Sequence, residues 1–214
     1  MNCVQLSFIK VRPEHFEQGM ETLTALRHAH GDGLQKWRVT QLGPGFLACY
    51  GTWHNEGQRR AFAAALEQTV GGELAPNVLS SQHYAGDEAA VFRPSAAAPA
   101  FQRMVVIKVK PSRADEVIRA AEGSLPNVFS SRPGFVEYAM IRSGDDTGIF
   151  ISSWKTKSQA QAEVLGSFSA LKQLGPSAVL TIGKLLPAFI SFDSYVGQVL
   201  AAEMPVESPP SPAT

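Results

Sequence analysis

The chain has 214 residues, 44% of them hydrophobic, and its 19 basic and 19 acidic residues balance to a formal net charge of zero. This composition is typical of a globular protein, and the even charge balance argues against nucleic acid or a membrane surface as a partner. Cys3 and Cys49 lack metal-binding spacing, so we expect no disulfide scaffold, no metal site and a cytoplasmic location. The sequence contains neither a signal-peptide pattern nor an apolar run long enough to span a bilayer.

The first half of the chain predicts six secondary-structure elements. Residues 3–11 alternate with a period of two, which is typical of a strand. Pro13 is suited to open a helix, because its missing N–H costs little in the first turn. Gly43-Pro44-Gly45 lies between two apolar runs and indicates a hairpin. The expected elements are a strand at 3–11, a helix from Pro13, strands at 37–42 and 46–53, a helix at 56–70 and a strand at 79–85.

The second half predicts the same order of elements. They are a strand at 101–110, a helix at 113–125, strands at 135–142 and 148–154, a helix at 157–174 and a strand at 187–196. The order β-α-β-β-α-β is that of the ferredoxin-like unit, in which two helices cover one face of a four-stranded antiparallel sheet.

Sequence matches between the halves indicate a duplication. The segment Ile9–Pro13 matches Ile107–Pro111 at four of five positions. Further matches follow in the same order: Gly33, Trp37, Gly43, Trp53 and Tyr84-Ala85-Gly86 against Gly134, Tyr138, Gly144, Trp154 and Tyr195-Val196-Gly197. The spacing between matched residues grows along the chain, as insertions would produce, so we interpret the chain as two copies of one unit.

Each predicted sheet has a second face that must be covered, and the other copy is the obvious cover. We therefore expect the two sheets to pack face to face. The predicted organisation is repeat 1 at 1–86, a linker rich in proline and alanine at 87–100, repeat 2 at 101–197, and a C-terminal extension at 198–214 that is disordered from about residue 205.

The second hairpin carries a resemblance to a known family. Pro133-Gly134-Phe135 opens its first strand, Arg142–Asp146 contains its turn, and Phe150–Lys157 passes through Trp154 into the second helix. This pattern resembles the antibiotic biosynthesis monooxygenase superfamily, and the likeness extends over both halves. The resemblance implies a dimeric α+β barrel. The predicted fold class is thus α+β, with two ferredoxin-like β-α-β-β-α-β repeats forming this barrel within one chain.

The resemblance implies several activities. The superfamily includes cofactor-free oxygenases of aromatic polyketides and quinols, haem-degrading monooxygenases and small-molecule isomerases. Our first hypothesis is a monooxygenase that uses no cofactor and acts on an aromatic or quinol-type small molecule. The alternative is a non-catalytic module that binds an apolar small molecule or a partner protein. The pseudo-dimeric chain could also form homo-oligomers.

Haem binding or degradation ranks behind both hypotheses. The haem-degrading members use an asparagine on the first strand, at the positions of Ser7 and Val105, and a histidine on the second helix. Residues 56–70 and 157–174 contain no histidine, so no axial ligand for haem iron is apparent.

The first hypothesis requires a base and hydrogen-bond donors beside an apolar pocket. The candidate catalytic residues are His54, His83 and Tyr84. The candidate substrate-binding residues are Trp53, Trp154, Trp37 and Tyr138. Trp53 and Trp154 end strands where the family places a tryptophan, and they could equally anchor a helix onto the sheet.

The remaining charged residues of the hairpin strands are expected to face solvent, because a half-exposed antiparallel sheet directs its polar residues outward. These residues are Arg38, Arg142 and Glu137.

Overall fold

The computed structural model of the chain describes residues 2–130, 132–162 and 188–203. The first half contains β1 (Cys3–Val11), η1 (Pro13–His15), α1 (Phe16–His30), β2 (Leu34–Gly43), β3 (Phe46–Trp53), α2 (Glu56–Gly71) and β4 (Val78–Phe92). The second half contains β5 (Phe101–Val109), η2 (Pro111–Arg113), α3 (Ala114–Ser130), β6 (Phe135–Ser143), β7 (Thr147–Trp154), α4 (Lys157–Ala162) and β8 (Phe189–Glu203). The rest of the helix predicted at 157–174, and the tail predicted to be disordered, lie outside the described residues.

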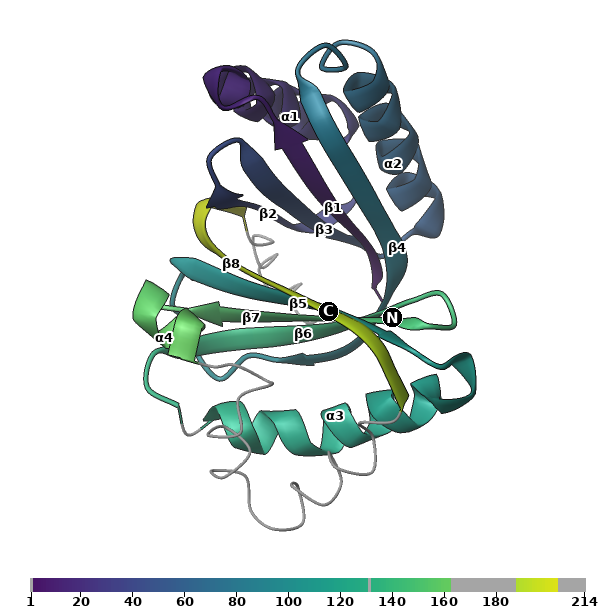
Figure 1. Cartoon of the computed structure of the whole chain (residues 1–214), viewed down its shortest axis with the longest axis vertical. Coiled ribbons are helices and arrows are strands. Elements are labelled where there is room, and N and C mark those ends of the chain that lie inside the picture. Colours follow the sequence, from purple (N-terminus) through teal and green to yellow (C-terminus); the bar gives the residue numbers. More distant parts are fainter. Residues whose placement is uncertain (1, 131, 163–187, 204–214) are drawn as a thin grey trace, which may run out of the picture.

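The eight described strands close into one barrel in the order β1-β3-β2-β8-β5-β7-β6-β4. The strands of each half are neighbours, and the halves join at two antiparallel seams, β2 with β8 and β4 with β6. In Figure 1 the two sheets face each other, with α1 and α2 outside the first sheet and α3 and α4 against the second. The predicted α+β barrel within one chain is confirmed. No helix among the described residues is long and apolar enough to cross a membrane.

The last strand of each half is long because it pairs with both halves. β4 pairs with β1 through residues 78–87 and with β6 through residues 87–92. β8 pairs with β5 through residues 189–198 and with β2 through residues 198–203. Each of these two strands therefore crosses a seam and ties the sheets together.

The long strands correct two predicted boundaries. The linker predicted at 87–100 begins with strand, since β4 runs to Phe92. The extension predicted from residue 198 also begins with strand, since β8 runs to Glu203. Local composition predicted both strands too short, because their outer residues form strand only by pairing with the other half of the chain.

A glycine at each seam permits the close approach of the halves. A Cβ atom on Gly86 would lie 1.9 Å from the carbonyl oxygen of Arg142, and one on Gly197 would lie 2.3 Å from that of Gln41. Only glycine fits where two backbones approach this closely. The seams therefore give a physical reason for the matched Tyr-x-Gly motifs of the two halves.

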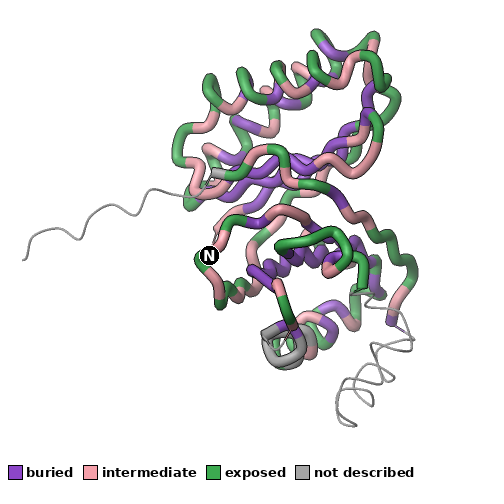
Figure 2. Tube along the Cα trace, turned by 90° about the vertical axis from the view of Figure 1, so that its left-hand side faces the viewer, coloured by how far each residue is buried: buried purple, intermediate pink, exposed green. Residues whose placement is uncertain are grey.

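Within the described ranges, hydrophobic side chains form three clusters, one inside the barrel and one between each sheet and its helices. Figure 2 shows the buried positions concentrated along the strands and on the inner sides of the helices. The barrel interior contains Val4, Leu6, Phe8, Ala48, Tyr50, Met104, Val106, Ile141, Ile149 and Ile151. The first helix-side core includes Ile9, Leu23, Trp37, Trp53, Phe62 and Leu66, and the second includes Val105, Val117, Phe129, Phe135, Tyr138 and Trp154.

Two residues predicted to face solvent are instead buried. Arg38 is 0% exposed and Glu137 is 2% exposed. Because successive strand residues face opposite sides, Arg38 points away from the helix-side neighbours Trp37 and Val39 and into the barrel. The expectation of a solvated sheet face fails here because the other half covers that face. Arg142 is 40% exposed, as the sequence predicted.

Candidate functional site

The four aromatic residues proposed for substrate binding lie in the two helix-side cores. Trp37 and Trp53 pack on the ring of Phe62 of α2, with centroids 5.4 and 5.1 Å away. Trp154 and Tyr138 lie in the second core, each within 6 Å of the Phe129 ring centroid. All four are at most 3% exposed. Their contacts are those of residues that anchor helices onto the sheets.

The three proposed catalytic residues do not meet in one site. His54 follows β3 and is exposed. His83 and Tyr84 are consecutive residues of β4, so their side chains face opposite sides of the sheet. Tyr84 packs toward the barrel interior, where its ring meets Phe8 edge-on with centroids 6.1 Å apart. His83 faces the helix side, where it has a polar partner.

That partner is Ser7 of β1, the residue directly opposite His83 in the β1–β4 pairing. His83 Nδ1 and Ser7 Oγ lie 2.9 Å apart. Ser7 is fully buried and shares its strand face with Ile9, which belongs to the helix-side core. The imidazole therefore lies at the boundary between the polar strand edge and the apolar layer beneath the helices.

A hydrogen-bonded chain continues from Ser7 to α2. Gln5 Nε2 donates to Ser7 Oγ at 3.2 Å, and Arg59 Nη1 donates to Gln5 Oε1 at 2.9 Å. Arg59 Nε and Nη2 donate to the carboxylate of Glu56 at 2.8 and 2.7 Å. A guanidinium can only donate, so Arg59 fixes which end of the Gln5 amide faces Ser7. We call the set His83, Ser7, Gln5, Arg59 and Glu56 the polar network.

The start of α2 places the two ionic members of the polar network. Asn55 caps the helix, since its Oδ1 accepts from the backbone N–H groups of Gly57 and Gln58 at 2.7 and 3.3 Å. Glu56 then lies in the first turn, where the helix dipole favours a carboxylate. Arg59 follows one turn later on the side that faces β1.

Electrostatics set the protonation states within the polar network. Hydrogen bonds from Arg59 lower the pKa of Glu56 to about 2, against a smaller effect of burial. Burial lowers the pKa of His83, and the more distant carboxylate of Glu67 opposes that effect. Burial and a contact with Glu56 raise the pKa of the Cys3 thiol. At neutral pH the network thus holds a carboxylate, a guanidinium and an uncharged imidazole.

The second half has no equivalent base. Val105 and Ser194 are directly opposed in the β5–β8 pairing, as Ser7 and His83 are in the first half. The arginine of the second half lies on a strand, whereas Arg59 lies on a helix. Arg103 of β5 donates to Ser194 Oγ at 2.8 Å and to the carbonyl oxygen of Ala160 in α4 at 3.4 Å. All five histidines of the sequence lie in the first half. The helix sides of the two halves therefore differ in chemistry.

Sequence reasoning found His83 but missed three of its neighbours, Gln5, Arg59 and Glu56. One signal for them was available, since Gln5 and Ser7 interrupt the face of β1 that otherwise carries Ile9 and Val11. Polar residues on a buried face require partners. Arg59 becomes that partner because of the way α2 packs across β1. Local sequence pattern does not predict this packing.

No group of three or more metal-binding side chains is found among the described residues. Haem also lacks its expected ligand among the described residues. Helices α2 and α4 contain no histidine there, so neither supplies an axial ligand for haem iron.

Known proteins share part of this sequence and this architecture. Residues 100–163 match the family model described as antibiotic biosynthesis monooxygenase. The second half of the chain therefore resembles the antibiotic biosynthesis monooxygenase family from β5 to α4. The matched residues cover β5 to β7 and most of the second helix-side core, whereas His83 and its network lie in the other half. No curated protein matches the sequence.

Solved structures with a similar fold match nearly the whole chain. An anthrone oxidase-like protein has a TM-score of 0.74 at 15% identity and covers 94% of this chain and 92% of its own. A candidate monooxygenase from Lactobacillus acidophilus has a TM-score of 0.68 at 12% identity, with 95% and 96% covered. A mutant chlorite dismutase from Candidatus Nitrospira defluvii has 0.61 at 9%, with 94% and 92% covered. Proteins named for different reactions share this fold, so these likenesses establish architecture alone.

Proposed function

We propose that the chain is a cofactor-independent monooxygenase that oxidises an aromatic or quinol-type small molecule, with His83 as its general base. The observation that carries this proposal is the half-buried, uncharged imidazole of His83 held by Ser7 at the edge of an apolar core. An imidazole whose pKa lies near or below neutrality is suited to remove a proton from an acidic phenol or activated CH₂ group. The family match over residues 100–163 and the likeness to an anthrone oxidase-like structure support the same reaction class.

The chemistry places a definite demand on His83. Its Nε2 must carry the free electron pair, so Nδ1 must bear the hydrogen and donate it to Ser7 Oγ. Once Nε2 takes a proton from the substrate, the same Nδ1–H bond holds the imidazolium in place. The substrate anion then supplies all four electrons that O₂ needs: a CH₂ group becomes a carbonyl, one oxygen atom enters the product and the other leaves as water.

The remainder of the polar network positions Ser7. Because Arg59 fixes the Gln5 amide, Gln5 Nε2 donates to one lone pair of Ser7 Oγ and leaves the other for His83. Glu56 in turn holds Arg59 through two hydrogen bonds. These groups orient the base, and they do so from a rigid strand and a capped helix.

Oxygen consumption with anthrone and a panel of hydroquinones tests the proposal. The wild-type chain should consume O₂ faster than substrate in buffer, and ¹⁸O₂ should label the product with one oxygen atom. His83→Gln should lower the catalysed rate about 100-fold or more, the usual contribution of a general base. The matched control is His30→Ala, which removes an exposed histidine at the end of α1 and should keep the wild-type rate.

His54→Ala provides a further comparison in the same assay. Loss of the rate in this variant, with retention in His83→Gln, would move the base to the exposed histidine and refute the proposed site. A wild-type rate equal to autoxidation across the panel would refute the oxygenase itself.

A second candidate function is binding of an apolar small molecule without catalysis. Its candidate location is a small pocket between the second sheet and α3, which would have to widen to admit a ligand larger than water. Its walls are mainly apolar, and Arg142 lies at its rim; the apolar lining residues are Ile107, Val109, Ala114, Val117, Ile118 and Phe150. Native mass spectrometry of the freshly purified chain tests this function. A ligand retained by the wild type should be absent from Val117→Trp, whose side chain would fill the pocket. A wild-type mass without ligand would count against this function.

A further inference from the structure

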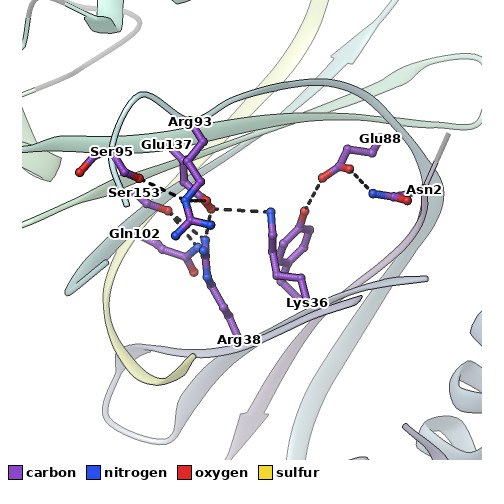
Figure 3. A network of polar contacts seen from close by, with 10 residues as sticks. Asn2, Lys36, Arg38, Glu88, Arg93, Ser95, Gln102, Glu137 and Ser153 are labelled. Atoms are coloured by element: carbon purple, nitrogen blue, oxygen red, sulfur yellow. Dashed lines mark hydrogen bonds and ion pairs between the residues drawn. The ribbon is translucent and has the colours of Figure 1, made fainter. Parts of the chain in front are cut away.

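A cluster of ionic side chains joins the two halves inside the barrel (Figure 3). Glu137 of β6 pairs with Arg38 of β2, with Lys36 of β2 at 3.9 Å, and with Arg93, which follows β4, at 3.6 Å. The Arg38 side chain is 0% exposed and that of Glu137 is 3% exposed. Lys36 and Arg38 belong to the first half, Arg93 lies in the segment that joins the halves, and the carboxylate belongs to the second half. Buried charges are tolerated only when they are paired, so each half supplies what the other lacks.

Uncharged groups extend this contact between the halves. Arg38 Nη1 donates to Ser153 Oγ at 3.2 Å, and Gln102 Nε2 donates to the same oxygen at 3.3 Å. Thr40 Oγ1 donates to Gln102 Oε1 at 2.6 Å. Ser153, Gln102 and Thr40 are all 0% exposed. The hydrogen bonds therefore lie deep in the interior, where a mismatched partner would leave them unmade.

The first half has one carboxylate of its own near the cluster, and it is already engaged. Glu88 accepts from Tyr50 Oη at 3.1 Å and from Asn2 Nδ2 at 2.8 Å. Lys36 lies above the Tyr50 ring, with Nζ 5.7 Å from its centroid. Figure 3 shows Glu88 and Asn2 to one side of the Glu137 cluster, and Lys36 contacts Glu137 itself. Glu88 thus belongs to the first half's own contacts.

Lys36 and Glu137 occupy the same position in the two copies. Each follows a matched glycine, Gly33 or Gly134, by three residues, and the glycines themselves have φ of +70° and +74°. Two first halves paired in this way would bring lysine against lysine. Two second halves would bring Glu137 against a second Glu137, and no described residue of the second half is seen to pair with that carboxylate.

We propose that this ionic cluster is a recognition element by which each half of the chain selects the other half and rejects a copy of itself. The kind of partner that fits either interior face is therefore a complementary unit, acidic for the first half and basic for the second. Two identical units would lose this complementarity here, because Lys36 and Glu137 occupy equivalent positions and one residue type would then face itself.

Charge exchange within the intact chain tests the proposal. Lys36→Glu places two carboxylates together, as in a pair of second halves, and Glu137→Lys places two ammonium groups together, as in a pair of first halves. Each variant should lower the urea midpoint of unfolding. The exchange variant K36E/E137K restores opposite charges in reversed positions and should lose less stability than the sum of the two single variants. The matched control is Asp115→Lys, which reverses a 65% exposed partner of Arg142 and should leave the midpoint nearly unchanged.

Every outcome bears on the proposal. Wild-type midpoints in the single variants, or an exchange variant that loses as much as their sum, would overturn it. If both single variants fail to fold, circular dichroism of the exchange variant decides: a folded protein supports recognition by charge, and an unfolded one overturns it.

Discussion

His83 and Ser7 face each other as directly opposed residues of two antiparallel strands, with Nδ1 and Oγ 2.9 Å apart. The pairing register alone brings them together, although 76 positions separate them in the chain. A buried hydroxyl opposite a half-buried imidazole leaves two arrangements of the proton, and only one of them leaves Nε2 free to act as a base. The ring nitrogen that carries this hydrogen therefore decides whether His83 can act as the proposed base.

The tautomer of His83 can be measured by ¹⁵N NMR. We expect Nδ1 to bear the hydrogen and the pKa to lie below the ordinary histidine value of 6.5, because burial disfavours the imidazolium. Ser7→Ala removes the acceptor and should shift the tautomer ratio toward the Nε2–H form. Observation of the Nε2–H form as the main wild-type species would contradict the proposed base.

Glu56 should contribute to stability in a defined pH range. Its pKa is about 2 in the folded chain against an ordinary value of 4.5. A depressed pKa adds stability that is fully present above the unfolded value and is lost as the pH falls from about 4.5 toward about 2. Urea unfolding across this range should therefore show a smaller pH dependence for Glu56→Gln than for the wild type. The difference should shrink at high salt, because Glu56 is partly exposed; equal slopes in both proteins would contradict the assignment.

Loss of the α2 cap should affect stability and the site together. Asn55→Ala removes acceptors for two backbone N–H groups and should cost about 1 kcal/mol in the free energy of unfolding. Since the same turn places Arg59 against Gln5, we also expect slower oxygen consumption with the substrate that the panel identifies. Asn55→Ser, which can still cap, should retain most of both properties. A fall in rate without any loss of stability would show that Asn55 acts in some other way.

The seam glycines should tolerate no side chain. Gly86→Ala and Gly197→Ala each place a Cβ atom within 2.3 Å of a carbonyl oxygen of the facing strand, and should destabilise the fold by roughly 1–3 kcal/mol as overpacking does. Gly71→Ala at the end of α2, where a Cβ atom would meet nothing within 4 Å, is the control. Calorimetric melting temperatures would report the difference, and equal values for the seam and control variants would disprove the close approach.

Much of the fold follows from local pattern. The period of two in β1 and the Gly43-Pro44-Gly45 turn predicted their elements, because a strand and a tight turn are defined by neighbouring residues. The extensions of β4 and β8 could not be predicted in this way, since their outer parts are strands only through pairing with the other half. The prediction that Arg38 and Glu137 face solvent was wrong for the same reason. Each is buried against a charge from the other half, which local sequence does not reveal.

The candidate site was predictable only in part. His83 could be chosen as a titratable residue on a strand, but its face depends on the register with β1. Tyr84, chosen with it, lies on the other side of the sheet. Residue type alone thus indicated the available chemistry, and the pairing of strands decided which groups could act together.

The seam between β2 and β8 has a consequence for how the protein is made. It pairs Trp37 with Glu203 and Gln41 with Gln198, so β2 leaves the ribosome long before its partner strand has been translated. During that interval the β2 edge is unpaired and the inner face of the first sheet, with Arg38, is uncovered. Exposed edges of this kind favour association between nascent chains. We therefore expect the interval before β8 emerges to be the period when the chain depends most on chaperones.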